Sequence, residues 1–149
     1  MKRILVGVDA SPASVQALER AADEARLRGA TLEVVHAFNP PDQSTAFPVV
    51  PEKGADKVNL EAERDKANAK LGRWLEESEV DLTDLDVEWS VLANNRATEV
   101  LIDRSKDADL VVVGSRGRGG FRGLLLGSTG EQVTRHAKCP VLVVRPTTR

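Results

Sequence analysis

Val111-Val112-Val113-Gly114-Ser115-Arg116-Gly117, followed by Gly127-Ser128-Thr129, is the part of the sequence that decides the fold. Three consecutive β-branched residues are typical of a buried strand, which ends at Gly114. Gly114 and Gly117 allow the backbone to turn tightly and a ligand to approach closely. Gly127-Ser128-Thr129 opens a segment with helical periodicity. A strand, a Gly-rich loop and a helix N-terminus in this order predict an anion site, because backbone N–H groups and the helix dipole favour negative charge there.

The length and composition predict one folded domain, residues 1–149. Apolar residues make up 41% of the chain and charged residues 30%, which is typical of a globular domain. A net charge of −2 and an aromatic content of 3% argue against a nucleic-acid-binding surface. The positive charge is concentrated instead at Arg116, Arg118 and Arg122 in the Gly-rich loop. This concentration favours a small anionic ligand.

The N-terminus and the cysteine content predict a cytoplasmic protein. The chain enters a strand directly, with no signal peptide, and no apolar run is long enough to cross a membrane. Cys139 is the single cysteine, so no internal disulfide can form. We interpret Cys139 as a small buried apolar residue, and a reactive thiol as the alternative.

Hydrophobic periodicity and turn residues predict alternating strands and helices. Ser11 and Pro12 form a good N-cap and N1 pair, and Gly29 stops the helix that they start. Asn94 or Asn95 is expected to cap the third helix. The expected strands span residues 2–8, 31–38, 86–91, 109–113 and 141–144, and the expected helices span about 12–28, 55–78, 95–106 and 127–137. Residues 39–54, with four prolines, are expected to be a long crossover loop, with a lid as the alternative.

This alternation predicts an α/β fold with a five-stranded parallel sheet and helices on both faces. In such sheets ligands bind beyond the carboxyl ends of the strands, where the strand order reverses. The loops after the first and fourth strands, Asp9-Ala10-Ser11 and residues 114–127, are therefore the candidate binding loops. Asp9 has a simpler interpretation as a cap of the first helix.

Two common nucleotide motifs do not match these loops. A P-loop needs G-x4-G-K-[ST], but no lysine occurs between Lys106 and Lys138. A dinucleotide fingerprint needs G-x-G-x-x-G after the first strand, where this chain has only Gly7. No His, Cys and Asp cluster has zinc-ligand spacing; His36 is expected in the core or at a strand end, and His136 near a helix C-terminus.

The spacing G-x2-G-x9-G-[ST] resembles the universal stress protein family, in its ATP-binding branch. The resemblance covers nearly the whole chain. It is carried by the motif residues together with the segments 4–11, 35–37, 109–117 and 139–144. The resemblance implies a Rossmann-like sheet of the adenine nucleotide alpha hydrolase type, with strand order 3-2-1-4-5. It also implies a homodimer in which the last strand, Val141–Val144, pairs with its copy; an open apolar edge would otherwise favour aggregation.

The same resemblance implies a role for each residue of the motif. Asp9, in the segment Gly7-Val8-Asp9, is expected to contact the nucleoside, Ala37 the adenine edge and Gly114 the ribose. Mg²⁺ is expected to accompany the triphosphate. The residues expected around the phosphates are Arg116, Gly117, Gly127, Ser128 and Thr129, where backbone N–H groups and hydroxyls can donate. Whether Arg118 and Arg122 contact phosphate or are solvated loop charges stays open.

The expected function is an ATP-binding stress-response or signalling module with unknown protein partners, and without nucleic acid or membrane as partner. Three alternatives remain. A slow ATP hydrolase could use the same site, although no Glu, Asp or His lies between Asp109 and Glu131 to activate water. A cyclic nucleotide such as cAMP could share the adenine and ribose contacts. A flavin protein with a related sheet would be yellow when purified.

Overall fold

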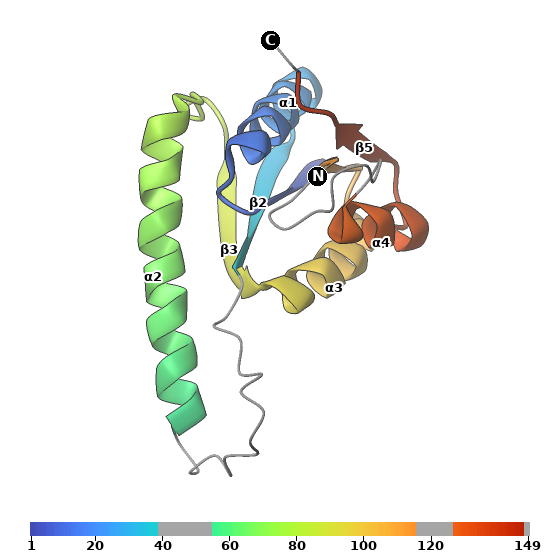
Figure 1. Cartoon of the computed structure of the whole chain (residues 1–149). Helices are drawn as coiled ribbons and strands as arrows, with labels where there is room; N and C mark the ends of the chain where they lie inside the picture. Colours follow the sequence, from blue (N-terminus) through green and yellow to red (C-terminus); the bar gives the residue numbers. More distant parts are fainter. Residues whose placement is uncertain (39–54, 116–126, 148–149) are drawn as a thin grey trace.

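The computed structural model describes residues 1–38, 55–115 and 127–147, without the side chains of 55–60, 94 and 95. Strands and helices alternate along the chain, as expected (Figure 1). The strands are β1 (Arg3–Val8), β2 (Thr31–Phe38), β3 (Val87–Ala93), β4 (Leu110–Gly114) and β5 (Val141–Val144). The helices are α1 (Pro12–Arg28), α2 (Ala55–Ser78), α3 (Asn94–Arg104), the 3₁₀ helix η1 (Ser105–Asp107) and α4 (Ser128–His136).

The five strands form one parallel sheet with the order β3-β2-β1-β4-β5. This confirms the predicted fold class and strand order. From β1, the strands β2 and β3 extend the sheet toward one edge, whereas β4 and β5 extend it toward the other. The order therefore reverses between β1 and β4, which is where parallel α/β sheets place their ligands.

Each face of the sheet has its own hydrophobic core. On one face α1 and α2 pack against alternate residues such as Ile4, Val6 and Val112. On the other face α3 and α4 pack against Leu5, Val35 and Val111 and their neighbours. Figure 1 shows α2 beside β3 and the pair α3 and α4 on the other side. Because side chains alternate along a strand, the central strands supply buried residues to both cores.

The ends of α1 follow the local signals in the sequence. Ser11 is the N-cap, its side chain accepts a hydrogen bond from the Ser14 N–H, and Pro12 occupies the first turn. Gly29 adopts a left-handed conformation at φ 60°, and its N–H bonds to carbonyls of the last turn. Only glycine takes this conformation without a steric cost, which explains why the helix stops there.

The predicted N-cap of α3 was wrong. Neither Asn94 nor Asn95 caps the helix; both lie inside it, and Ala93 occupies the N-cap position without a side-chain cap. The reason is that β3 pairs with β2 as far as Ala93, so the chain passes from strand to helix without an intervening turn. At the other end, α3 stops at Arg104 and continues as η1. The predicted loop 39–54 lies outside the described residues.

Candidate functional site

The candidate site lies at the carboxyl edge of the sheet, around the end of β1. The β1–β2 register ends with Val8 opposite His36, whereas β2 continues to pair with β3 through Phe38. Ala37 therefore lies on a part of β2 that extends beyond β1. The His36 side chain is buried, as expected, with Nδ1 3.3 Å from the Val8 carbonyl oxygen.

The loop after β1 is organised around the Asp9 carboxylate. Asp9 Oδ1 accepts hydrogen bonds from the Ser11 N–H at 3.0 Å and from the Ser14 hydroxyl at 2.5 Å. Ala10, between Asp9 and Ser11, has a φ of 59°, a left-handed conformation that is unfavourable for a residue with a Cβ. Asp9 is not the N-cap residue of α1, because Ser11 holds that position; the Asp9 carboxylate instead accepts a hydrogen bond from the N–H of this N-cap residue.

The two ends of the Gly-rich loop meet directly beyond β4. The Ser115 N–H donates to the Val144 carbonyl at 2.9 Å, and the Gly127 N–H donates to the Ser115 carbonyl at 2.7 Å. The first turn of α4 thus starts beside the carboxyl end of β4. Ser128 is exposed and Thr129 half-buried there. The expected phosphate residues Arg116 and Gly117, with Arg118 and Arg122, lie outside the described residues.

Gly7 and Gly114 occupy different surroundings. Gly114 is the last residue of β4 and pairs with Val144 of β5. Gly7 faces α3, where an added Cβ would lie 2.9 Å from Cδ1 of Leu101. The structure therefore gives Gly7 a packing role, namely the close approach of α3 to the sheet. The ligand role expected for it stays a prediction.

Three further polar contacts at this edge were missed by the sequence reasoning. Ser14 holds Asp9, as described above. The Trp74 indole of α2 donates to the Ser11 carbonyl at 3.0 Å, and Thr98 Oγ1 of α3 lies 3.4 Å from Thr129 Oγ1. The spacing Asp9-x-Ser11-x-x-Ser14 could have indicated Ser14, because both serines fall in the first turn of a helix. No local signal indicates Trp74 or Thr98, since both reach the site from other helices.

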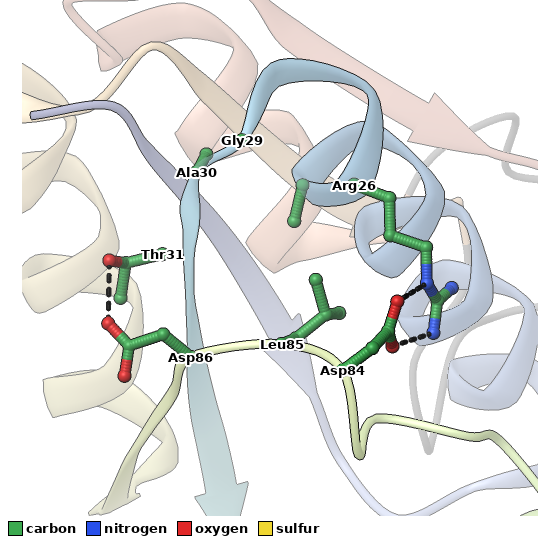
Figure 2. A pocket seen from close by; sticks show the side chains of 8 residues that line it. Arg26, Gly29, Ala30, Thr31, Asp84, Leu85 and Asp86 are labelled. Carbon is green, nitrogen blue, oxygen red and sulfur yellow. Dashed lines mark hydrogen bonds and ion pairs between the residues drawn. The ribbon is translucent and has the colours of Figure 1, made fainter.

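A pocket also exists at the opposite, amino edge of the sheet. It is lined by Ala25, Arg26, Gly29, Ala30, Thr31, Asp84, Leu85 and Asp86. Figure 2 shows that its polar side chains are paired with one another: Arg26 with Asp84, and the Thr31 hydroxyl with Asp86. The hydrogen bond from Arg26 lowers the pKa of the Asp84 carboxyl below its ordinary value. These pairs attach the C-terminal end of α1 and the start of β2 to the segment before β3. We therefore interpret the polar groups of this pocket as structural.

The described residues contain neither a metal-ligand cluster nor a membrane-spanning helix. Within residues 1–38, 55–115 and 127–147, no group of three or more His, Cys, Asp or Glu side chains is placed to hold a metal ion. In those ranges no helix has both the length and the apolar character needed to span a bilayer.

The fold and the site define a class: a doubly wound parallel α/β protein with polar groups and a helix N-terminus at its topological switch point. The chain belongs to the universal stress protein family, whose sequence model matches residues 1–145. Universal stress protein Rv2623 of Mycobacterium tuberculosis is 39% identical over 144 residues, 95% of this chain and 44% of the relative. Rv2005c of the same organism is 40% identical over 95% of this chain and 45% of the relative. The chain spans about half the length of the curated relatives it matches.

Solved structures of the family share the fold. Universal stress protein UspA from Lactobacillus plantarum superimposes with a TM-score of 0.69 at 25% identity, covering 97% of each chain. A universal stress protein solved in complex with cAMP superimposes with a TM-score of 0.56 at 25% identity, covering 97% of this chain and 96% of the other. The family membership suggested by the motif and its flanking segments is thus confirmed.

Proposed function

We propose that this chain is an ATP-binding universal stress protein that works as a nucleotide-dependent stress-response or signalling module. The observation that carries the proposal is the 2.7 Å hydrogen bond from the Gly127 N–H to the Ser115 carbonyl. It brings the N-terminus of α4 to the end of β4, next to the Asp9 loop. A helix N-terminus with serine and threonine in its first turn attracts phosphate, and the switch point accommodates the nucleoside.

The proposed contacts follow the order of the strands around the switch point. Asp9, on the loop that Gly7 and Val8 lead into, holds the nucleoside. Ala37 meets the adenine edge and Gly114 lies near the ribose. Arg116, Gly117, Gly127, Ser128 and Thr129 surround the phosphates. Mg²⁺ enters with the triphosphate.

The proposed function includes an assembly and a location. Residues 1–149 form a single cytoplasmic domain, and two copies pair through Val141–Val144 of β5. β5 lies at one edge of the sheet, and all four of its residues are half-buried and apolar. An apolar edge strand with unpaired backbone groups is stabilised when a second strand covers it.

The test is calorimetric titration with ATP and Mg²⁺, on protein first checked for nucleotide carried through purification. Wild type is expected to bind in the micromolar range, and Gly117→Ala is expected to weaken binding by at least about tenfold, because the added methyl crowds the phosphate path. Gly72→Ala, on α2, is the matched control and should bind like wild type, since its Cβ has no neighbour within 4 Å. An empty, folded wild type that does not bind ATP would overturn the proposal.

A cyclic nucleotide is the second candidate ligand, favoured by the relative solved with cAMP. Competition distinguishes the two, because cAMP has one phosphate and cannot use the whole α4 end of the site. If ATP is the ligand, cAMP displaces it only weakly, and Gly117→Ala affects ATP more than cAMP. A rate of ATP hydrolysis well above the spontaneous rate, lost in Arg116→Ala, would instead support the hydrolase alternative.

A further inference from the structure

The Ser14 hydroxyl makes three hydrogen bonds beside the candidate site. Ser14 lies in the first turn of α1, and its residue is only 7% exposed. Its Oγ donates to Asp9 Oδ1 at 2.5 Å and accepts from the Asp9 N–H at 3.1 Å. A third contact joins it to Ser11 Oγ at 3.2 Å. Ser14 therefore holds Asp9 by both its backbone and its carboxylate.

The direction of these hydrogen bonds follows from the inventory of a serine hydroxyl. A hydroxyl has one proton and two acceptor lone pairs. The proton of Ser14 goes to Asp9 Oδ1, which as a carboxylate oxygen can only accept. Both remaining contacts of Ser14 are therefore accepted hydrogen bonds, and the Ser11 hydroxyl is the donor in the third. All three capacities of the Ser14 hydroxyl are used within the Asp9 loop.

This arrangement differs from the usual start of a helix. In a capping box, a Glu or Gln at the third helical position reaches back to the N-cap N–H. Here the third position is Ser14, and the N-cap Ser11 N–H donates to Asp9 Oδ1 instead. No acidic residue occurs in the first turn of α1. The first turn is thus built to receive the Asp9 carboxylate, which supplies the negative charge that favours a helix N-terminus.

Two donors on one carboxylate oxygen restrict the side-chain torsions of Asp9. The 2.5 Å contact has the length of a charge-assisted O–H to carboxylate hydrogen bond. Ala10 would adopt its left-handed conformation only at a cost, so the same hydrogen bonds also hold the loop in its strained form. A group fixed before the ligand arrives loses little freedom on binding, which raises affinity.

We propose that Ser14 is a positioning residue for nucleotide binding: it orients the Asp9 carboxylate toward the nucleoside without touching the ligand. This inference rests on the proposed function, because it assumes that Asp9 contacts the nucleotide. It predicts that Ser14 matters only while Asp9 is present. A residue with a merely structural role would weaken binding whether or not Asp9 were there.

The test is a double-mutant cycle measured by calorimetric titration with ATP and Mg²⁺ on wild type, Ser14→Ala, Asp9→Ala and the double variant. Ser14→Ala is expected to weaken ATP binding about tenfold, the size expected for a hydrogen bond to a charged group. In the Asp9→Ala background the same change is expected to alter affinity less than about twofold. A tenfold effect that persists without Asp9, or no effect of Ser14→Ala on wild type, overturns the inference.

Two further variants make the outcome specific. Ser14→Thr keeps the hydroxyl and should bind within about threefold of wild type; a loss as large as that of Ser14→Ala counts against positioning by the hydroxyl. Ser105→Ala removes another buried serine hydroxyl, at the amino edge, bonded to the Ile102 carbonyl and the Lys138 N–H, and should lower stability but leave ATP affinity unchanged. If wild type fails to bind ATP, the proposed function fails. If wild type binds but Asp9→Ala binds equally well, the positioning inference and the proposed Asp9 contact fail, whereas ATP binding by the chain stands.

Discussion

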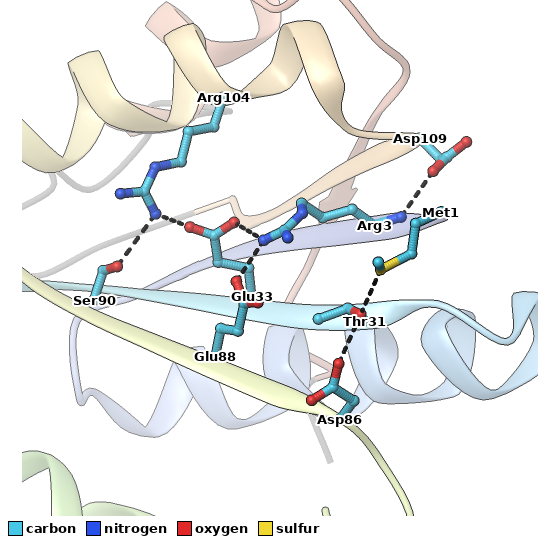
Figure 3. Close-up of polar contacts among 9 residues, drawn as sticks. All are labelled: Met1, Arg3, Thr31, Glu33, Asp86, Glu88, Ser90, Arg104 and Asp109. Carbon is cyan, nitrogen blue, oxygen red and sulfur yellow. Dashed lines mark hydrogen bonds and ion pairs between the residues drawn. The ribbon is translucent and has the colours of Figure 1, made fainter.

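Glu33 on β2 and Arg3 on β1 form a 2.7 Å ion pair across two neighbouring strands, with the Glu33 side chain only 4% exposed. Arg104, at the end of α3, forms an ion pair with the other oxygen of the same carboxylate. Figure 3 shows these groups together with Ser90, which Arg104 also contacts, and Glu88. One buried carboxylate therefore links β1, β2 and α3 on the α3 face of the sheet.

Glu33→Gln is expected to lower the free energy of unfolding. The variant keeps the shape of the side chain but leaves two guanidinium groups without their buried counter-charge. Breaking a buried pair costs about 3–5 kcal/mol, and the partial exposure of both arginines reduces the expected loss to roughly 1–3 kcal/mol. Urea denaturation measures it.

Glu88→Gln is the matched control for Glu33→Gln. Glu88 pairs with the same Arg3 at 2.6 Å, but its side chain is 53% exposed. An exposed pair contributes no more than about 1 kcal/mol, so this variant should be nearly neutral. Equal losses in the two variants would show that burial of Glu33 is not what makes its ion pairs important.

Gly7→Ala is expected to destabilise the protein by about 1–3 kcal/mol, the usual cost of adding volume to a packed core. The added Cβ would meet Leu101, which is itself only 1% exposed and has little room to move. Thermal unfolding followed by circular dichroism measures the effect. Gly72→Ala, in the middle of α2 with open space around the new Cβ, should instead stabilise the helix by about 0.5–1 kcal/mol. If both variants stabilise the protein, the contact between α3 and Gly7 is looser than described.

Trp74→Phe is expected to cost about 0.5–1.5 kcal/mol, because it removes the 3.0 Å indole hydrogen bond to the Ser11 carbonyl, which keeps a 3.1 Å hydrogen bond from the Ser14 N–H. The chain has two tryptophans, and Trp74 is 7% exposed whereas Trp89 is 41% exposed. Acrylamide should therefore quench the fluorescence of Trp89→Phe, which retains Trp74, much less than that of Trp74→Phe. Similar quenching of the two variants would contradict the docking of α2 onto the Asp9 loop.

Cys139 is expected to react slowly with iodoacetamide near pH 8. Partial burial, and secondly the negative charge of Asp109, raise the pKa of its thiol, and only the thiolate is nucleophilic. A raised folded-state pKa favours the protonated form, so the associated stability is present below the ordinary thiol pKa and is lost as the pH rises through the raised one. Unfolding in urea should accelerate alkylation strongly, and Asp109→Asn less so, because burial is the larger cause. A native rate equal to the unfolded rate would show that the thiol is fully accessible.

Boundaries set by local chemistry could be predicted from the sequence. The bounds of α1, β2, α2 and β5 agree with the expected ranges, because prolines, glycines and apolar periodicity act within a few residues. The start of α3 could not be predicted, because pairing of β3 with β2 overrides the capping preference of Asn94 and Asn95. Cys139, expected to be buried, is only partly so, since it precedes the edge strand β5.

The candidate site, too, has a part that could be predicted from the sequence and a part that could not. The positions of Asp9, Gly114 and Gly127 at the ends of predicted elements placed them at one edge of a parallel sheet without any structure. The meeting of Ser115 with Gly127, and the approach of Trp74 and Thr98 from other helices, depend on how the helices pack.

The sequence by itself determined the class of fold, the order of its elements and the residues of the candidate phosphate site, because periodicity, turn residues and loop composition are local properties of the chain. The tertiary structure alone decided which distant groups meet. In the sequence, Glu33 is an isolated acidic residue in a mostly apolar strand, and Ser14 is one serine near the start of a helix. In the structure, Arg3 and Arg104 pair with Glu33, and Ser14 bonds to Asp9. Such contacts arise only when packing brings separate elements within hydrogen-bonding distance, and burial then makes each of them matter.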